Sequence, residues 1–582
     1  MRVNSQHRFV SHDGEELFFQ RWQPSASSGE KKAVLLFHRG HEHSGRMAHL
    51  VDELNLPDFE FFAWDARGHG DSPGERGDAP SFSACVQDID CFTQHLQNEY
   101  GIQPQNMAVV AQSVGAVMSA TWVHDYAPKI RALCMASPAF DIKLYVPLAR
   151  PGLSLMSKLR GNFFINSYVK AGMLTHDKAR AAEYDSDPKI ARAISVRMLL
   201  GLYEASDRVV ASAENIHVPT QLLSSGSDFV VHRKPQFAFY QRLSHPLKEF
   251  HTLPGFHHDT LGEKDRMLAV NKVRRFITQC FATPYQAPDV LDADKMGSGC
   301  ALAEELSTPL PAGSLRDRYW KLAKANLKFG SKFSTGLKIG EDTGYDSGST
   351  LDFVYRNQPE SQGFLGKLMD KQYLAAIGWR GIRVRKTNIE VLLRKYAQRL
   401  AEQGKAVRML DIASGHGRYI LDAVAELEPR PASILLRDYS DINVAAGQRL
   451  IESRGLSAIA QFVQADAFNT ESLAAIEPRV NLAVVSGLYE LFNDNDLLRR
   501  SLQGLQQAVE QDGYLVYTCQ IWHPQQEFIA RALTSHRQGD AWVMRMRSQA
   551  EMDALVEQAG FCKIDQRIDE FGIFTVAVAQ KR

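Results

Sequence analysis

The sequence predicts an α/β protein with two doubly wound domains. Short apolar runs alternate with amphipathic helical patterns in two separate series, one before residue 283 and one after residue 387. Such alternation is typical of parallel sheets that are covered by helices on both faces. The length of 582 residues also exceeds the ~100–200 residues of one domain. We therefore expect two sheets in one chain.

Composition excludes several other classes. Hydrophobic residues make up 44% and charged residues 23% of the chain, close to globular averages, which argues against a disordered or fibrous protein. Lys and Arg number 67, as do Asp and Glu, so we expect no nucleic-acid partner. No apolar run approaches the ~18–20 residues of a membrane span, and residues 1–10 lack an apolar signal core. The seven scattered cysteines include no Cys-x-x-Cys, which favours a reduced, cytoplasmic protein.

The first series begins with a hairpin. Asp13-Gly14 is a turn signal between two apolar runs, Arg8–Val10 and Leu17–Trp22. Short runs of buried-type residues follow, and they indicate strands of a parallel sheet, because helices cover both faces of such a sheet. We expect these strands at Ala33–Phe37, Phe61–Trp64, Met107–Val110, Ala132–Met135 and Gln221–Ser224, with helices such as Phe82–Tyr100 between them.

A proline-rich stretch separates the two series. Four prolines fall between residues 283 and 313, where we expect a linker, because proline fixes φ and removes a backbone donor. The second series has strands at Val407–Leu410, Ser433–Leu436, Ala460–Val463, Leu482–Val485, Tyr514–Thr518 and Phe574–Ala579. The predicted organisation is a first domain at 1–282 with an insertion at about 141–215, a linker at 283–313, a basic helical extension at 314–386 and a second domain at 387–582.

The helical extension is basic although the whole chain is neutral. Residues 314–405 carry 18 Lys and Arg against 9 Asp and Glu. Arg318–Phe329 interleaves lysines with Trp320 and other apolar residues. Two interpretations stay open: this helix packs on the second domain, or it lies on an anionic membrane surface and holds the protein at the inner membrane. Further along, Thr387-Asn-Ile-Glu390 is a capping box that predicts the start of a helix.

The most informative stretch of the first domain joins a strand to a helix through Ala111-Gln-Ser113-Val-Gly115. A nucleophilic serine on a sharp strand-to-helix turn needs small residues two before and two after it. Ala111 and Gly115 meet that need. An acid, Asp228, follows a later strand, and His258 lies on a later loop. The order serine, acid, histidine is that of an α/β-hydrolase triad, in which the histidine accepts the serine proton.

The first domain resembles the lysophospholipase and monoacylglycerol-lipase-like α/β-hydrolases, which are grouped with serine aminopeptidases. Residues 37–46, FHRGHEHSGR, and 65–72, DARGHGDS, are similar to two signatures of that family, and the resemblance covers roughly residues 7–280. It implies Ser113 as nucleophile, Asp228 as acid and His258 as base, with the backbone N–H groups of Gly40 and Val114 as oxyanion donors. His258 rather than His257 occupies the family's Gly-x-x-His position. Arg39 stands where the family has Gly.

Other interpretations of these residues stay open. His38, His41 and His43 are metal-ligand types, but their glycine neighbours fit a turn better, and we expect no metal. The domain is alternatively an inactive scaffold with the same fold. Apolar residues of the insertion form a lid over an acyl pocket or serve packing alone: Met156, Leu159, Phe163, Phe164 and Tyr168.

In the second domain a strand ends in an acid and continues through a small-residue turn into a helix: Asp411-Ile-Ala413-Ser-Gly415-His-Gly417. Glycines let a loop approach a nucleotide closely, and the helix N-terminus offers free N–H groups. After the next strand, Asp438 is placed to bind both hydroxyls of a ribose.

After the third strand, Asp466 and Phe468 are placed to accept from an adenine amino group and to pack on its ring. Together with the loop, these residues resemble class I S-adenosylmethionine-dependent methyltransferases over roughly residues 387–582. The resemblance implies S-adenosylmethionine as cofactor, held by Asp411, Ala413, Gly415, Gly417, Asp438, Asp466 and Phe468. Ala413 replaces the family's first glycine. An NAD-binding domain and a degenerate fold without cofactor stay open, although Asp411 before the loop favours the methyltransferase.

Tyr489 and Glu490 follow the fourth strand, at the sheet edge where a methyl acceptor is expected. Both are candidate acceptor-side residues, or they begin a helix and pack. The sequence thus predicts a bifunctional enzyme: a serine ester hydrolase for acylglycerol-like or lysophospholipid-like substrates, and a methyltransferase for an unnamed, lipid-related acceptor. The alternatives are a hydrolase-fold scaffold with an active methyltransferase, and two independent enzymes for small molecules.

Overall fold

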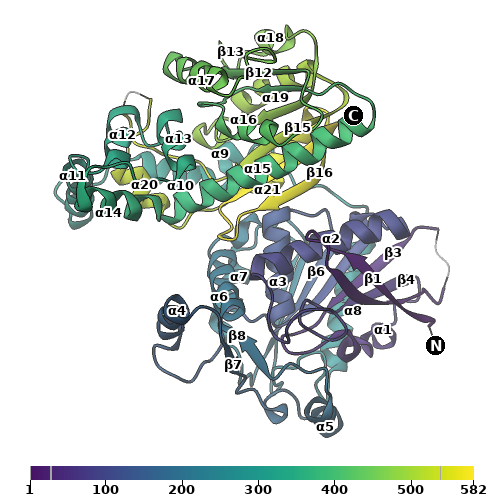
Figure 1. The fold of residues 1–582 in the computed structure, drawn as a ribbon. Helices are drawn as coiled ribbons and strands as arrows, with labels where there is room; N and C mark the ends of the chain where they lie inside the picture. Colours follow the sequence, from purple (N-terminus) through teal and green to yellow (C-terminus); the bar gives the residue numbers. More distant parts are fainter. Residues whose placement is uncertain (1, 27–28, 538) are drawn as a thin grey trace. The chain divides into compact units, whose positions relative to one another are not determined.

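The computed structural model describes residues 2–26, 29–537 and 539–582, and the chain folds into two compact units, Met1–Pro288 and Asp289–Arg582 (Figure 1). Each unit is built on one large sheet, of eight strands in the first and seven in the second. The predicted fold class of two α/β domains is confirmed. No helix in the described part of the chain is long and apolar enough to cross a membrane.

The first unit carries a mixed sheet in which six neighbouring strands run parallel. The hairpin predicted around Asp13-Gly14 forms its antiparallel edge. The strand order is β1 (Asn4–Val10), β2 (Glu16–Trp22), β4 (Phe59–Trp64), β3 (Lys32–Phe37), β5 (Met107–Gln112), β6 (Ala132–Ala136), β9 (Thr220–Ser225) and β10 (Lys248–Leu253).

Helices cover this sheet on both faces. Residues of α1 (Leu50–Glu53) and α8 (Met267–Phe281) form one buried cluster with β3, β4 and β5. On the other face, α3 (Val114–Tyr126) packs on β5 and against α2 (Phe82–Tyr100). The predicted insertion lies between β6 and β9. Its elements are α4 (Ala149–Arg160), β7 (Phe164–Asn166), α5 (Lys178–Ser186), β8 (Ala193–Ser195) and α6 (Val196–Ala211).

The second unit has five parallel strands followed by an antiparallel pair. The order reverses direction between β11 and β14, which makes the carboxyl end of these two strands the expected ligand crevice. The strand order is β13 (Ala460–Gln464), β12 (Ser433–Asp438), β11 (Arg408–Asp411), β14 (Val480–Val485), β15 (Val509–Gln520), β17 (Phe574–Lys581) and β16 (Phe561–Ile568).

The helix predicted to start at Thr387 starts ten residues earlier. Helix α15 runs without a break over Ile377–Glu402, so the predicted boundary at 386/387 falls inside it. Its last four turns bury Ile389, Leu392 and Tyr396 against the sheet. Because residues 377–386 continue the same amphipathic helix, the capping box is overridden by packing on both sides of it.

Five helices of the second unit belong to a separate layer with its own core. Leu337, Phe353 and Trp379 pack there with Trp542 and Phe574. Figure 1 shows this layer gathered at one end of the second unit. Its helices are α11 (Leu315–Gly330), α12 (Thr335–Thr343), α13 (Gly348–Arg356), α14 (Gly363–Leu374) and α20 (Gln526–Ala532).

Most of the predicted linker belongs to the second unit. Short helices α9 (Ala293–Met296) and α10 (Ser298–Ser307) occupy it. The carbonyl of Leu291 accepts hydrogen bonds from the Asn495 amide at 3.1 Å and the Arg499 guanidinium at 2.8 Å. Within the stretch expected as a linker over 283–313, α10 buries Ala303 and Leu306, whereas α9 buries none of its residues.

Candidate functional site

Ser113 lies on a strained turn between β5 and α3. Its φ of +56° and ψ of −116° are uncommon for a residue with a side chain. A Cβ on Gly115 would lie 2.3 Å from the carbonyl oxygen of His38, so only glycine fits there. The Ser113 amide donates to the Ala136 carbonyl at 2.9 Å, which holds the turn against β6. The turn therefore presents the Ser113 hydroxyl at the carboxyl edge of the sheet.

Three buried side chains form one hydrogen-bonded chain at this edge. His258 Nε2 lies 2.8 Å from Ser113 Oγ, and His258 Nδ1 lies 2.8 Å from Asp228 Oδ2. The amides of Val230 and Val231 donate to Asp228 Oδ1 at 2.7 and 3.0 Å. Burial acts to raise the pKa of Asp228, but His258 and these two amides hold it below its usual value. Asp228 therefore faces His258 as a carboxylate.

A small, mostly apolar cavity of about 90 Å³ opens beside Ser113 and His258. Gly40 and Val114 line it as well, and a Cβ on Gly40 would lie 2.9 Å from the Val114 side chain, so their backbones are adjacent. The insertion supplies the far wall with Ile165, Tyr168, Leu174, Ile194 and Leu199. Met156 and Leu159 do not line this cavity; on α4 they are 40% and 78% exposed.

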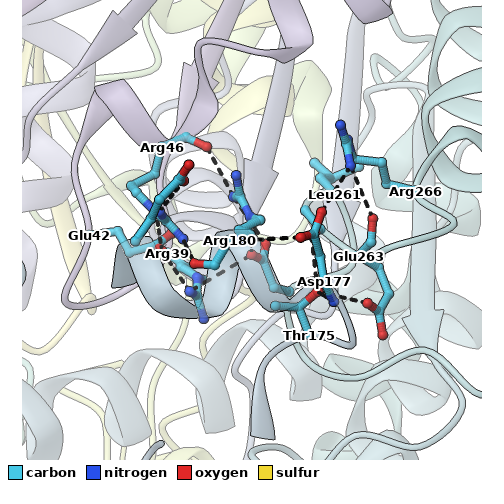
Figure 2. A network of polar contacts seen from close by, with 12 residues as sticks. Arg39, Glu42, Arg46, Thr175, Asp177, Arg180, Leu261, Glu263 and Arg266 are labelled. Carbon is cyan, nitrogen blue, oxygen red and sulfur yellow. Dashed lines mark hydrogen bonds and ion pairs between the residues drawn. The ribbon is translucent and has the colours of Figure 1, made fainter. Parts of the chain in front are cut away.

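Arg39, which replaces the family's glycine, anchors the loop after β3. It is 4% exposed and donates to Glu42 Oε1 at 2.6 Å, and Arg46 Nε donates to the same oxygen at 3.1 Å. Arg46 also exchanges hydrogen bonds with Arg180 of α5: each guanidinium donates to the other residue's carbonyl. Figure 2 shows these cations and Glu42 clustered beside α5.

Asp259 connects this network to the segments that carry Ser113 and His258. Arg180 Nε donates to Asp259 Oδ2 at 2.6 Å, and Gln112, the residue before Ser113, donates to Asp259 Oδ1 at 3.0 Å. Burial acts to raise the pKa of Asp259, but Arg180 and Arg39 hold it far below its usual value. The residue after His258 thus ties the insertion to the histidine loop and to the serine strand. Nothing in the sequence marked Asp259 or Arg180, which lie 79 positions apart.

The described residues hold one group with the spacing of metal ligands: His176, His257 and Glu263, whose ligand atoms lie within 4.8 Å of one another. Glu263 Oε2 already accepts from Thr175 Oγ1 at 2.7 Å and from the His176 amide at 2.8 Å (Figure 2). The predicted alternative at His38, His41 and His43 is not among the groups found in the described chain. Glu263, which follows His258 in the chain, thereby holds the insertion at Thr175 and His176.

In the second unit the glycine loop leaves β11 and enters α16 (Arg418–Ala425). Gly415 and Gly417 have φ of +56° and +75°, and a Cβ on Gly417 would lie 2.6 Å from Leu436. Helix α13 covers the loop, so the cavity over it measures only about 30 Å³. Ala413, Gly415 and Ser486 line this cavity with Asp352 and Arg385.

A charged residue of the helical layer contacts the start of the helix that follows the glycine loop. Arg418 donates to Asp352 of α13 at 2.6 Å. Two buried polar atoms of the cavity wall, Ser486 Oγ and Arg385 Nε, have no hydrogen-bond partner among the described residues. Buried polar groups are normally satisfied, so these two atoms fit a polar ligand on the loop. Asp352 lies outside the sequence-predicted set, because only the fold brings α13 onto the loop.

The predicted cofactor acids lie at the same sheet edge. Asp438 Oδ2 accepts from the Gly415 amide at 2.8 Å, and its Oδ1 accepts from Asn443 Nδ2 at 3.0 Å. Asp466 is exposed and closes a turn with the Phe468 amide at 2.9 Å. The Phe468 ring lies 4.7 Å from the ring of Phe492. Asp438 thus supports the loop directly. Asp438, Asp466 and Phe468 are not among the residues that line the small cavity over the loop.

Asp411 is fully buried at the end of β11. Burial raises its pKa to about 7, although the Tyr419 hydroxyl and the Ala413 amide donate to its carboxyl group. Of the two acceptor-side candidates, Glu490 lines a large cavity beside the loop, and Arg385 donates to its Oε1 at 3.1 Å. Tyr489 is buried in the sheet core instead, and its hydroxyl lies 2.9 Å from Ser501 Oγ.

Each of the two units matches a known protein family. A family model described as "Putative methyltransferase" matches residues 273–581, and one described as "Serine aminopeptidase, S33" matches residues 28–265. The chain belongs to the first of these families through more than half of its length. Its N-terminal unit is an α/β-hydrolase of the S33 type.

Individual relatives agree with this division. "Uncharacterized protein YnbC" of Escherichia coli is 53% identical over 582 residues, which is 100% of this chain and 99% of that protein. The monoglyceride lipase of Mus musculus is 27% identical over 224 residues, 38% of this chain and 72% of the lipase. The monoacylglycerol lipase of Mycolicibacterium smegmatis is 22% identical over 280 residues, 47% of this chain and 97% of the lipase. The hydrolase unit is therefore related to monoglyceride lipases.

The Asp259 network generates a stability prediction. Asp259→Asn removes the carboxylate that faces Arg180 and Arg39, and breaking a buried ion pair costs about 3–5 kcal/mol. We expect the first unit to lose that much stability in hydrogen-exchange measurements on peptides of β5 and α5. The control is Asp207→Asn, because Asp207 pairs with Arg150 on the exposed surface. Equal losses in both variants would contradict a central role for Asp259.

Asp411 generates a pH prediction. Its pKa of about 7 lies above the ~3.9 of an unfolded aspartate. The folded state therefore holds a proton that the unfolded state loses, and this contribution to stability is full below about pH 4 and lost as the pH rises through about 7. Asp411→Asn should reduce the loss of unfolding free energy between pH 5 and pH 8. Urea unfolding at pH 5 and at pH 8 measures this loss, and an unchanged pH dependence in the variant would refute the raised pKa of Asp411.

Proposed function

We propose that the N-terminal unit is a serine ester hydrolase that acts on acylglycerol-like or lysophospholipid-like esters. The hydrogen-bonded chain Ser113–His258–Asp228 carries this proposal. The apolar cavity beside Ser113 supports an acyl substrate, and so do the relatives that are named as monoglyceride lipases. An inactive scaffold would have no reason to keep Ser113 in a strained turn within reach of a buried histidine.

Each residue has a definite task in this proposal. His258 Nε2 accepts the Ser113 proton while Oγ attacks the ester carbonyl, and the Gly40 and Val114 amides stabilise the resulting oxyanion. His258 then gives its proton to the leaving alcohol, which leaves an acyl-serine. Water, deprotonated by the same histidine, attacks the acyl group and releases the acid and Ser113. Asp228 holds the Nδ1–H side of the imidazole and stabilises its cationic form.

Fluorophosphonate labelling tests the nucleophile. The full chain should be labelled on Ser113, and Ser113→Ala should reduce labelling to background because it removes the hydroxyl that lies 2.8 Å from His258 Nε2. Ser186→Ala, which removes an exposed hydroxyl of α5, should leave labelling unchanged. Full labelling of Ser113→Ala, or no labelling of a folded wild-type chain, would reject the hydrolase proposal in favour of a scaffold.

We further propose that the C-terminal unit transfers a methyl group from S-adenosylmethionine. Two unpartnered buried atoms, Ser486 Oγ and Arg385 Nε, beside the glycine loop carry this proposal. The cofactor supplies an electrophilic methyl group on a sulfonium. The loop amides and Asp438 would hold its amino acid and ribose parts, and Asp466 and Phe468 its adenine. The antiparallel strand β17 between β15 and β16 departs from the 3-2-1-4-5-6 order of dinucleotide domains, which disfavours NAD.

Calorimetry with S-adenosylhomocysteine tests this cofactor. Asp438→Ala should weaken binding by at least tenfold, because hydrogen bonds to a charged group are worth about 1.5–3 kcal/mol. Asp441→Ala removes an exposed acid three residues further on and should leave the affinity unchanged. Binding of NAD without binding of S-adenosylhomocysteine would reject the methyltransferase proposal.

A further inference from the structure

A cavity of about 380 Å³ lies between the helical layer and the sheet of the second unit. Its size falls within the ~300–1,000 Å³ of small-molecule sites. Leu351 and Arg385 line both this cavity and the smaller one over the glycine loop, so the two are adjacent. The walls are mainly apolar and aromatic: Leu327, Leu337, Tyr373, Trp379, Trp542 and Phe574.

Several polar atoms of the cavity wall lack partners among the described residues. Glu490 Oε2 and Gln520 Oε1 are buried acceptors of this kind, and Tyr373 Oη, Trp542 Nε1 and Arg385 Nε are buried donors. Arg385 donates to the other oxygen of Glu490, which fixes this carboxylate beside the glycine loop. Buried polar atoms without partners call for a ligand that completes their hydrogen bonds. The cavity therefore suits a molecule with an apolar body and a polar head that both donates and accepts hydrogen bonds.

The same helices present apolar side chains to solvent. On α11, Leu315, Tyr319, Leu322 and Phe329 follow the spacing of one helix face, and Leu322 and Phe329 are 62% and 61% exposed. Trp320 is not part of this face, because its indole donates to Glu527 Oε1 at 3.1 Å and its ring lies 6.2 Å from that of Phe528. Four apolar residues that follow in the sequence are exposed as well: Phe333, Phe364, Leu365 and Leu368. The end of α11 lies close to α14, because a Cβ on Gly330 would lie 3.0 Å from Met369.

This outward face, the docking face, also carries positive charge around it. Lysines at positions 321, 324 and 328 of α11 and at 367 and 371 of α14 are all exposed. The one acid of α11, Asp317, is bonded to Lys321 at 2.9 Å, and the one acid of α14, Asp370, is buried. A second copy of this chain would bring like charges together, whereas an anionic membrane surface would be attracted.

We propose that the docking face of α11 and α14 binds an anionic membrane surface, and that the cavity beneath it takes an amphiphilic lipid from that membrane as methyl acceptor. The second part rests on the proposed methyltransferase function. The acceptor's N–H or O–H group would lie at Glu490 and Gln520 with its apolar part along Trp379 and Trp542. Transfer would form a bond between that N or O atom and the methyl carbon and would break the carbon–sulfur bond, whose electron pair stays on the sulfur of the leaving S-adenosylhomocysteine. The displaced proton would pass to the Glu490 carboxylate.

Flotation of the full chain with vesicles tests the docking face. The protein should float with phosphatidylglycerol vesicles at low salt, poorly with phosphatidylcholine vesicles, and less as salt rises. Leu322→Glu with Phe329→Glu should reduce flotation at least fivefold. Met296→Glu is the matched control, since Met296 is 87% exposed but lies outside the docking face. Flotation of the double variant that equals that of Met296→Glu would overturn the proposal. So would dimers that form through the docking face without any flotation.

N-phenyl-1-naphthylamine, an apolar probe with one N–H donor, tests the cavity. Ala376→Trp and Met369→Trp each fill the cavity. Each should therefore raise the Kd of the probe at least tenfold. Ala375→Trp is the control, because Ala375 is exposed and does not line the cavity. Unchanged probe affinity in both filled variants refutes the acceptor cavity. Calorimetry of the same proteins separates the causes: absent S-adenosylhomocysteine binding in the wild type would refute the cofactor proposal instead.

Discussion

Both sites depend on one constraint: the chain must leave a buried parallel strand through a turn that has no room for an ordinary side chain. At Ser113 the turn is held by Gly115, whose missing Cβ lets α3 approach the His38 carbonyl. In the second unit the missing Cβ of Gly417 leaves space that the Leu436 side chain fills. Because parallel strands end at a common edge, each turn meets groups that are distant in sequence. One turn thereby presents a hydroxyl to His258, and the other presents backbone amides toward Asp438.

Buried charge is treated differently in the two units. Asp259 is satisfied by Arg180 and Gln112, so it ties the insertion to the serine strand. The Arg385–Glu490 pair is satisfied on one side only, and each partner keeps a buried atom without a hydrogen bond among the described residues. Half-satisfied networks are costly to a fold unless a ligand completes them. The difference between Asp259 and the Arg385–Glu490 pair is therefore one of hydrogen bonding rather than of residue type.

The sequence predicted the strands that are buried on both faces, along with Ser113, Asp228, His258 and the glycine loop, because these follow local rules of spacing and size. It missed β10 and β16, which lie at sheet edges and alternate polar with apolar residues. Tyr489 and Glu490 were inseparable by sequence, since only the fold turns one into the core and the other toward a cavity. Asp259 was missed for the same reason: its partner Arg180 lies 79 positions away along the chain.

Helix α11 carries apolar residues on two sides. Trp320 and Leu327 face inward, where Leu327 forms part of the cavity wall, while Leu322 and Phe329 face solvent. One apolar face is enough to hold a surface helix on its protein, and a second one is a liability in water. The outward face is therefore explained by a contact that the folded unit alone does not supply. The cavity lies only one helix thickness, about 10 Å, behind that contact. Leu327 of the same helix lines the cavity, so a single helix separates this contact from the cavity that holds Glu490.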